Sequence, residues 1–291
     1  MGTRLDWFFL RPLSPAFGAA PMWIKGEWDE DRADYDRLLA LPYTGWSWEY
    51  MRRNPFLKAA RRRAGAVRAF KGLRPDGSVL FRLNQRCYVA ERFGLHFLPN
   101  PALSAFDVTP FWLPEVMSAS FDAALQIETR LKTGGPLLRW DEIPGEKHFL
   151  VAPGRREKLV IEAPGYAAQL ALDSNALPVP QAVYFSLTLG AGQLVGKHLR
   201  EVEEFARVCH GATGGHKRLR GLSPEKLRDA IIALDGELAG VPRRRIASAI
   251  FGENLVAEDW DGGVNSYKQR TKRLVDKGLS LMRYGYKKLL R

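Results

Sequence analysis

The sequence SYKQRTKRLVDKGLSLMRYGYKKLLR, residues 266–291, combines dense positive charge with a helical pattern. It holds nine Lys and Arg residues and a single acid, Asp276, in a chain whose net charge is +12. At about 100° per residue, its apolar and small side chains fall on one side of a helix. These are Tyr267, Thr271, Leu274, Val275, Gly278, Leu281, Met282, Gly285 and Leu289. The other side is basic, which predicts an amphipathic helix with one face packed on a core.

Shorter helices are predicted upstream of this basic helix. Ser223 followed by Pro224 is typical of a helix start, and Pro242 opens a further short helix that Gly252 ends. The apolar side chains of that short helix are Ile246, Ala247, Ile250 and Phe251. Two successive helices of this kind are the parts of a helix-turn-helix. Its connection has about 3–4 residues in standard cases. Residues 253–265 form a longer connection, so we expect a variant with an insertion.

Double-stranded DNA is the partner that the residue types of the basic helix favour. Gln269 and Arg273 can each bond a base edge with two hydrogen bonds, whereas Lys268 and Lys272 suit phosphates. The full predicted DNA-contact set is Ser266, Lys268, Gln269, Arg270, Lys272, Arg273, Lys277, Arg243, Arg244 and Arg245. Two alternatives remain open. One is a solvated basic helix in an ordinary bundle, and the other is a protein adaptor whose basic helix docks an acidic partner.

A second basic cluster lies nearer the N-terminus. Residues 52–71 hold eight Lys and Arg residues and no acid. Asn54 and Pro55 within this stretch are typical of a helix start. The candidate contacts are Arg52, Arg53, Arg61, Arg62 and Arg63. We expect the cluster to be a second DNA contact, a protein contact or a solvated helix.

Aromatic residues precede this second cluster. Trp46 and Tyr50 are four residues apart, so they share a helical face and are expected to pack in a core. Trp48 lies on another face, where stacking on single-stranded bases stays open. Trp260, among the acids of residues 258–261, is expected either to close the helical core or to contact a protein partner.

The middle of the chain predicts strands and turns. Residues 78–83, 147–152, 157–162 and 181–189 are short and apolar or alternating. Pro-Gly pairs at residues 153–154 and 164–165 predict turns, hence a small antiparallel meander from 147 to 189. The sequence therefore predicts an α+β fold. It comprises a basic helical module (1–72), a linker and β-rich region (73–190) and a helix-turn-helix variant (191–291).

Several function classes are disfavoured by composition and motifs. A hydrophobic fraction of 46% argues against general disorder, and two cysteines do not make a disulfide framework. No apolar run approaches the roughly 20 residues of a membrane span. The glycines of residues 190–196 depart from the phosphate-loop pattern, because Lys197 is followed by His198. Cys209 and His210 lack zinc-ligand spacing. We therefore expect a cytoplasmic protein without enzymatic activity, metal or cofactor.

Two stretches resemble known families. The sequences LRDAIIALDGELAGVPRRRIASAIFG (227–252) and RTKRLVDKGLSLMRYGYKKLL (270–290) resemble a proteobacterial C-terminal helix-turn-helix-variant domain of unknown function. WSWEYMRRNP (46–55) resembles the transcriptional-regulator-like module often found before it, and residues 92–115 resemble the linker. Together they are similar to the frameshifted excision activators of integrative and conjugative elements. The resemblance implies a transcriptional activator of excision and transfer, restrained by a small antiactivator. RNA polymerase is a further expected partner.

Overall fold

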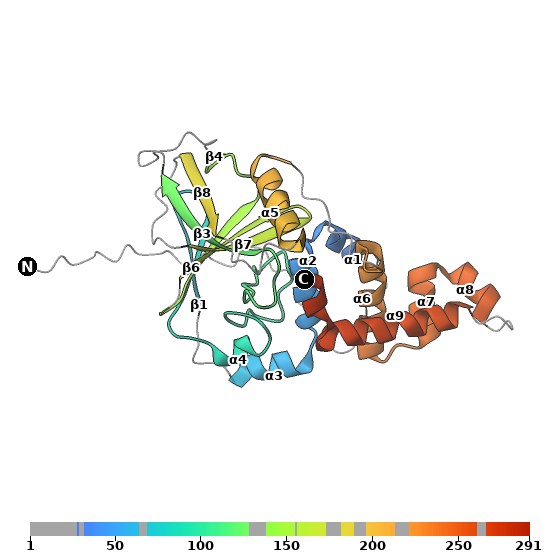
Figure 1. The fold of residues 1–291 in the computed structure, drawn as a ribbon. Helices are drawn as coiled ribbons and strands as arrows, with labels where there is room; N and C mark the ends of the chain where they lie inside the picture. The colour runs from blue at the N-terminus through green and yellow to red at the C-terminus, as the bar shows by residue number, and fades with distance from the viewer. Residues whose placement is uncertain are drawn as a thin grey trace, which may run out of the picture.

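The computed structural model describes residues 28, 32–63, 69–127, 138–154, 156–172, 182–188, 196–212, 221–260 and 266–291. Its strands lie together in one part of the molecule, and helices α6 to α9 extend from that part to one side (Figure 1). The C-terminus lies between the two parts, beside helix α2. The predicted α+β class agrees with this arrangement.

The described strands form an eight-stranded mixed sheet in the order β1-β2-β5-β6-β7-β3-β8-β4. Most neighbours are antiparallel, but β2 runs parallel to β5 and β3 runs parallel to β7. The strands are β1 (Ala69–Leu73), β2 (Val79–Leu83), β3 (Ser120–Ile127), β4 (Leu138–Arg139), β5 (Glu146–Val151), β6 (Glu157–Ala163), β7 (Tyr166–Leu172) and β8 (Ala182–Thr188). The prediction of a small, purely antiparallel region was therefore wrong.

The predicted meander is correct for its first part only. Strands β5, β6 and β7 follow one another with antiparallel pairing, and Gly165 forms the turn before β7 with φ 73°. Strand β8 does not continue the meander, because β3 lies between β7 and β8. All seven residues of β7 are buried. A strand buried on both faces belongs inside a sheet, with a neighbour on each side.

The N-terminal segment consists of short helices, of which α2 is almost completely buried. They are α1 (Arg32–Asp36), the short 3-10 helix η1 (Arg37–Ala40), α2 (Tyr43–Met51) and α3 (Pro55–Arg63). Every residue of α2 is buried except Thr44, which is half-buried. Trp46 and Tyr50 lie in the core as predicted. Trp48 is buried too, and its Nε1 donates to the Leu103 carbonyl at 3.1 Å. Stacking of Trp48 on bases is therefore excluded.

The C-terminal part is helical, as predicted. Its elements are α5 (Gly196–Cys209), α6 (Pro224–Ala239), α7 (Arg243–Phe251), α8 (Glu253–Trp260), α9 (Ser266–Arg283) and the 3-10 helix η4 (Gly285–Leu290). Helix α4 (Tyr88–Glu91) lies in the segment between β2 and β3. Helix α9 packs closely on α6. A Cβ atom at Gly278 would lie 2.6 Å from the Ala230 carbonyl oxygen. Glycine is therefore required at this crossing.

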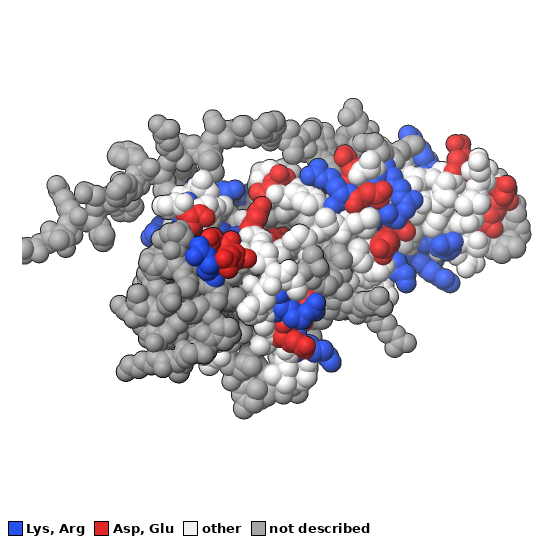
Figure 2. All heavy atoms as spheres, turned by 90° about the horizontal axis from the view of Figure 1, so that it is seen from above, with Lys and Arg blue, Asp and Glu red and all other residues white. Residues whose placement is uncertain are grey.

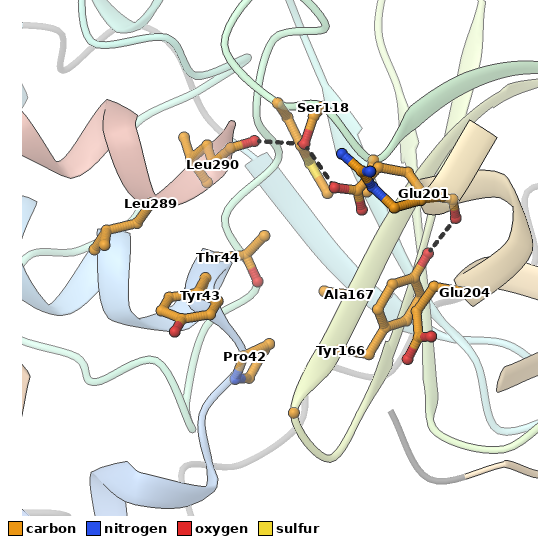
Figure 3. Close-up of a pocket in the computed structure, with 14 residues that line it drawn as sticks. Pro42, Tyr43, Thr44, Ser118, Tyr166, Ala167, Glu201, Glu204, Leu289 and Leu290 are labelled. Atoms are coloured by element: carbon orange, nitrogen blue, oxygen red, sulfur yellow. Dashed lines mark hydrogen bonds between the residues drawn. The ribbon is translucent and has the colours of Figure 1, made fainter. Parts of the chain in front are cut away.

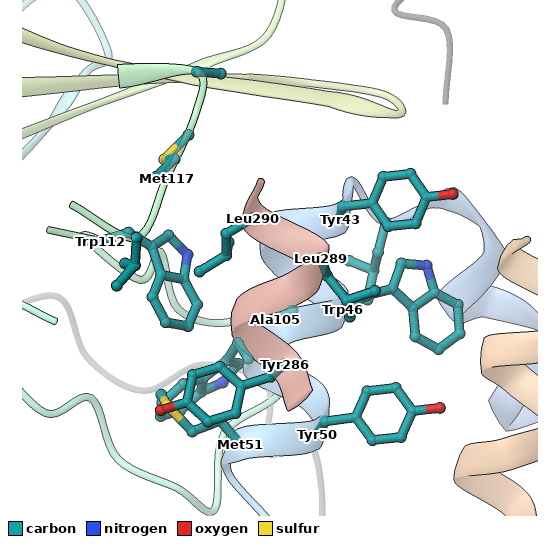
Figure 4. Packing of buried hydrophobic residues seen from close by; sticks show 14 of the residues in the cluster. Tyr43, Trp46, Tyr50, Met51, Ala105, Trp112, Met117, Tyr286, Leu289 and Leu290 are labelled. Atoms are coloured by element: carbon teal, nitrogen blue, oxygen red, sulfur yellow. The ribbon is translucent and has the colours of Figure 1, made fainter. Parts of the chain in front are cut away.

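The N-terminal and C-terminal helices share one core. Helix η4 lies against α2, and Tyr286 of η4 packs near Trp112 with ring centroids 6.1 Å apart (Figure 4). The Tyr50 hydroxyl donates to the Leu227 carbonyl at 2.6 Å, and Ser47 Oγ donates to the Tyr286 carbonyl at 3.0 Å. Strand β1 also crosses the predicted boundary at residue 72. The three predicted segments are thus joined by common packing.

Candidate DNA-binding surface

Helix α9 has the two faces that its sequence predicts. The packed face consists of Thr271, Val275, Gly278, Leu281 and Met282, all of them buried. The opposite face is exposed. It carries Lys268, Gln269, Arg270, Lys272, Arg273 and Lys277. The structure therefore brings six of the predicted DNA-contact residues onto one solvent-facing side of a single helix.

The positive charge on this face is balanced only in part, because Asp276 is the one acid that α9 exposes beside five cations. Among the residues that the structure describes, Lys268, Lys272 and Arg273 form no ion pair with an acid. Partial burial and the neighbouring Lys288 lower the pKa of Lys277. Figure 2 shows basic side chains over the helical part with acidic side chains among them, and further acidic side chains at its far end. A polyanion would supply the counter-charge that the protein lacks here.

Asp259 fixes the beginning of α9. Its Oδ2 accepts a hydrogen bond from the Tyr267 backbone N–H at 2.9 Å and lies 3.3 Å from Ser266 Oγ. The first N–H groups of a helix have no partner within it, so a carboxylate at this position stabilises the helix. Ser266 is half-buried. Its hydroxyl is therefore engaged with the protein, which departs from its predicted role as a DNA contact.

Helix α8 occupies most of the predicted insertion. Residues 253–260 form a helix, and only Gly252, with φ 95°, separates α8 from α7. Glycine adopts this backbone conformation readily, which permits the abrupt corner. The two helices predicted to form a helix-turn-helix, α7 and α9, are in contact but have α8 between them in the chain. Trp260, at the end of α8, is half-buried, so both of its predicted roles stay open.

Arg270 is held at the junction of α7 and α9. Its guanidinium lies 4.6 Å from the ring centre of Phe251 and 5.3 Å from that of Tyr267. These two rings are themselves 5.0 Å apart. Cation–π contacts restrict the rotamers of Arg270 while leaving the side chain exposed. The aromatic pair is a feature of the site that the charge pattern alone did not reveal.

The three arginines of α7 occupy its first turn. Arg243, Arg244 and Arg245 are all exposed, and Arg243 Nη2 lies 3.3 Å from a carboxylate oxygen of Glu237. The positive end of a helix dipole is an unfavourable place for cations. A bound anion near this turn would offset that repulsion, so the arrangement suits phosphate contacts.

Arg52 and Arg53 were predicted as surface contacts, and this prediction was wrong. They are only 3% and 5% exposed. Arg53 forms two hydrogen bonds with Asp235, at 2.6 and 2.8 Å, and Arg52 Nε bonds Glu49 at 2.7 Å. The reason is that buried guanidinium groups require carboxylate partners. Glu49 and Asp235 supply them from α2 and α6.

The buried ion pairs control the ionisation of Glu49. Burial alone would raise its pKa, but the guanidinium groups of Arg52 and Arg53 outweigh that effect and lower it. The neighbouring Ala105 N–H also donates to Glu49 at 2.7 Å, which favours the charged carboxylate. Arg53, Glu49 and Asp235 therefore form a charged network inside the molecule, between helices α2 and α6.

The remainder of the second basic cluster is accessible. Arg62 and Arg63 are exposed and Arg61 is half-buried, all in the last turn of α3. Cations are favourable at the C-terminal end of a helix, so this position needs no bound anion to explain it. A contact of these three residues with DNA or protein stays a prediction.

The remaining sequence features concern metal binding, membrane spans, Cys209 and the glycine-rich stretch. Among the described residues, no three His, Cys, Asp or Glu side chains are grouped to hold a metal ion. No described helix combines the length and apolar character needed to cross a membrane. Burial raises the pKa of Cys209 to about 12. Most of the glycine-rich stretch before Lys197 lies outside the described residues.

Comparison with known proteins bears on the same helices. A search of curated proteins finds no match to this chain. Residues 186–291 match the family model described as "T6SS, Transcription factor, DNA binding domain". The matched range includes helices α5 to α9 and therefore the exposed basic face of α9. The match supports a DNA-binding regulator, in agreement with the charge and geometry of the site.

Proposed function

We propose that the chain is a sequence-specific DNA-binding transcriptional activator that places the N-terminal half of α9 in the major groove. One observation carries this proposal. Lys268, Lys272 and Arg273 are exposed together without acidic partners among the described residues, while the opposite face of their helix is packed on α6. A helix fits the major groove and can present side chains to base edges there.

Distinct roles follow for the exposed side chains. Gln269 and Arg273 can read bases with paired hydrogen bonds, whereas Lys268 and Lys272 contact phosphates and set the orientation of the helix. The arginines in the first turn of α7 extend the phosphate contacts, since their position opposes the helix dipole. Arg270, held by Phe251 and Tyr267, is already oriented before DNA binds.

Selection of bound sequences from a random duplex pool tests this proposal on the full-length chain. We expect a defined consensus. Arg273→Ala should relax the consensus at one position, because a paired contact with guanine is worth about 1–3 kcal/mol of discrimination. Lys272→Ala should weaken binding to all sequences while preserving the consensus. Enrichment of no sequence, with salt-sensitive binding retained, would contradict specific recognition.

The regulated genes are a finer part of the proposal. Resemblance to excision activators favours promoters that control excision and transfer of an integrative and conjugative element, with RNA polymerase and a small antiactivator as partners. The matched domain description instead refers to type VI secretion. Mapping of bound genomic sites by immunoprecipitation separates these targets. Discrete sites next to excision genes would support the first, and their absence there would remove it.

A non-enzymatic role as a protein adaptor is the alternative that the same basic face permits. An adaptor would bind an acidic protein through α9 and give no discrete genomic sites. Helix α8, which contacts α9, exposes the acids Glu253 and Glu258, so this part of the molecule carries both signs of charge. The matched DNA-binding domain favours DNA over this alternative.

A further inference from the structure

A pocket lies between the segment before α2 and the hairpin of β5 and β6, where β5 begins and β6 ends. Its volume is about 420 Å³, within the range of about 300–1,000 Å³ that is usual for small-molecule sites. Its apolar lining includes Leu41, Phe81 and Val108. Small-molecule sites are mostly apolar, and a few polar groups give them specificity. The polar groups of this pocket therefore decide which ligand it suits.

Glu162, near the end of β6, is a half-buried acid that lines the pocket. Its carboxyl group has no hydrogen-bond or ion-pair partner among the residues that the structure describes. Glu146 lies directly opposite it in the antiparallel pairing of β5 with β6, and like charges in such positions repel each other. Burial and the charge of Glu146 raise the pKa of Glu162 to about 7. A cation bound here would offset both effects.

His148 is a second polar group on the same face of the sheet as Glu146. It is 6% exposed and also lines the pocket. Its Nε2 lies 3.1 Å from a carboxylate oxygen of Glu146, so Nε2 carries the proton and donates it. Burial lowers the pKa of His148, which favours the neutral ring. Nδ1 is then an acceptor, and no described group bonds to it. The pocket thus has two acceptors that lack a donor.

The other charged side chains of the lining do not neutralise Glu162. Lys71 of β1 is the one Lys or Arg side chain that lines the pocket in the described part of the chain. It contributes to lowering the pKa of His148, but no cation opposes the rise in the pKa of Glu162. Asp107 is exposed and accepts two hydrogen bonds from Ser104. Negative charge is therefore in excess at the end of the pocket that Glu162 lines.

A second pocket, between α2 and α5, shows the opposite situation (Figure 3). It also contains two glutamates, Glu201 and Glu204. Glu204 pairs with Arg207 at 2.7 Å, and Arg200 lines the same pocket. Arginines of the protein therefore supply positive charge beside these acids, whereas none is present beside Glu162.

We propose that the pocket at Glu162 binds a small organic cation that carries an amidinium or guanidinium group on an apolar body. The planar cationic group donates two hydrogen bonds to the Glu162 carboxylate, the geometry that such groups favour. The second acceptor, His148 Nδ1, favours a ligand with further N–H donors. The apolar body lies against Leu41 and Val108. Nothing in this assignment depends on DNA binding.

Calorimetry on the full-length chain without DNA tests the site with three probes of similar shape. They are the cation benzamidinium, the neutral benzamide and the anion benzoate. At about pH 8, where Glu162 is ionised, we expect saturable binding of benzamidinium and weaker binding of the other two. Glu162→Gln keeps the size of the side chain and should weaken benzamidinium binding about tenfold through loss of a charge-assisted contact. Glu157→Gln, a half-buried position at the other end of β6, is the matched control and should leave binding unchanged.

The pH dependence of binding to the native chain identifies the group without a variant. Because the ligand requires ionised Glu162, binding should weaken as the pH falls below about 7, with uptake of a proton by the free site. Glu162→Gln should lose this dependence, and thermal melting verifies that it folds. The other titratable or charged side chains that line the pocket are Glu146, His148, Lys71 and Asp107. Absence of saturable benzamidinium binding, equal effects of the two glutamine variants, or a pH dependence that Glu162→Gln retains would overturn the proposal.

Discussion

Two groups of arginine and lysine residues look alike in the sequence and differ completely in the folded chain. Arg52 and Arg53 are buried between α2 and α6 with carboxylate partners, whereas Lys272 and Arg273 of α9 are exposed without any among the described residues. Charge density alone therefore does not identify a polyanion-binding surface. Burial decides whether a cation is available to a polyanion, because a buried cation must be neutralised by carboxylates of the protein itself.

The largest loss of stability is expected when the buried ion pair of Arg53 with Asp235 is broken. Asp235→Ala removes the carboxylate that bonds Arg53 and leaves a buried guanidinium with one partner fewer. Breaking such a pair costs about 3–5 kcal/mol. Urea unfolding of the full-length chain measures this loss. Arg62→Ala, which removes an exposed arginine from α3, is the control and should change stability little. Equal stabilities of the two variants would show that Asp235 is not part of a buried network.

A smaller loss of stability is expected when the packing of α9 on α6 is disturbed. Gly278→Ala would place a Cβ atom 2.6 Å from the Ala230 carbonyl oxygen and 2.8 Å from Leu234 Cβ, so α9 must move away from α6. Overpacking of this kind costs about 1–3 kcal/mol. Gly196→Ala is the matched control, since its added methyl group meets nothing within 4 Å. Thermal unfolding compares the two. A stabilised Gly278→Ala protein would contradict the close crossing of α6 and α9.

The start of α9 should contribute least to stability. Asp259→Ala removes the acceptor of the Tyr267 N–H, and loss of such a capping interaction costs about 0.5–2 kcal/mol. The expected result is a modest drop in melting temperature with a larger loss of DNA affinity, because the exposed contacts begin at Lys268, in the first turn of α9. Glu258 is an exposed acid next to Asp259 in α8. The variant Glu258→Ala therefore separates the loss of the capping interaction from the loss of a negative charge. An identical response of both variants would argue against the capping role.

The sequence predicted α9 well and the sheet poorly. The helix has an uninterrupted apolar stripe from Thr271 to Met282, a local signal that burial in the structure confirms. Strands β3 and β7 carry Ala-rich sequences such as SFDAALQI and YAAQLAL, whose residues favour helices by intrinsic propensity. Pairing with distant strands overrides that preference. The order of the strands depends on long-range contacts that no local pattern contains.

Only part of the candidate DNA-binding surface could be predicted from the sequence. Exposure of the basic face followed from helical spacing. Helix α8 and the Asp259 contact did not, because residues 253–265 were interpreted only as a long connection with an insertion. The burial of Arg52 and Arg53 had a local signal that counting charges within residues 52–71 missed. Glu49 lies one helical turn earlier and is placed to pair with both. Asp235, distant in sequence, could not be identified in that way.

The salt dependence of DNA binding by the full-length chain tests most directly whether the exposed basic face of α9 contacts DNA. Neutralisation of about four phosphates predicts a slope of about −4 when the logarithm of the binding constant is plotted against that of the salt concentration. The triple variant Lys268→Ala, Lys272→Ala, Arg273→Ala should reduce the slope to about −2, since the two lost phosphate contacts, those of Lys268 and Lys272, remove about 0.9 each. Lys226→Ala, at an exposed position on α6, should leave it unchanged. An unaltered slope in the triple variant would contradict the assignment of α9 as the DNA-binding helix.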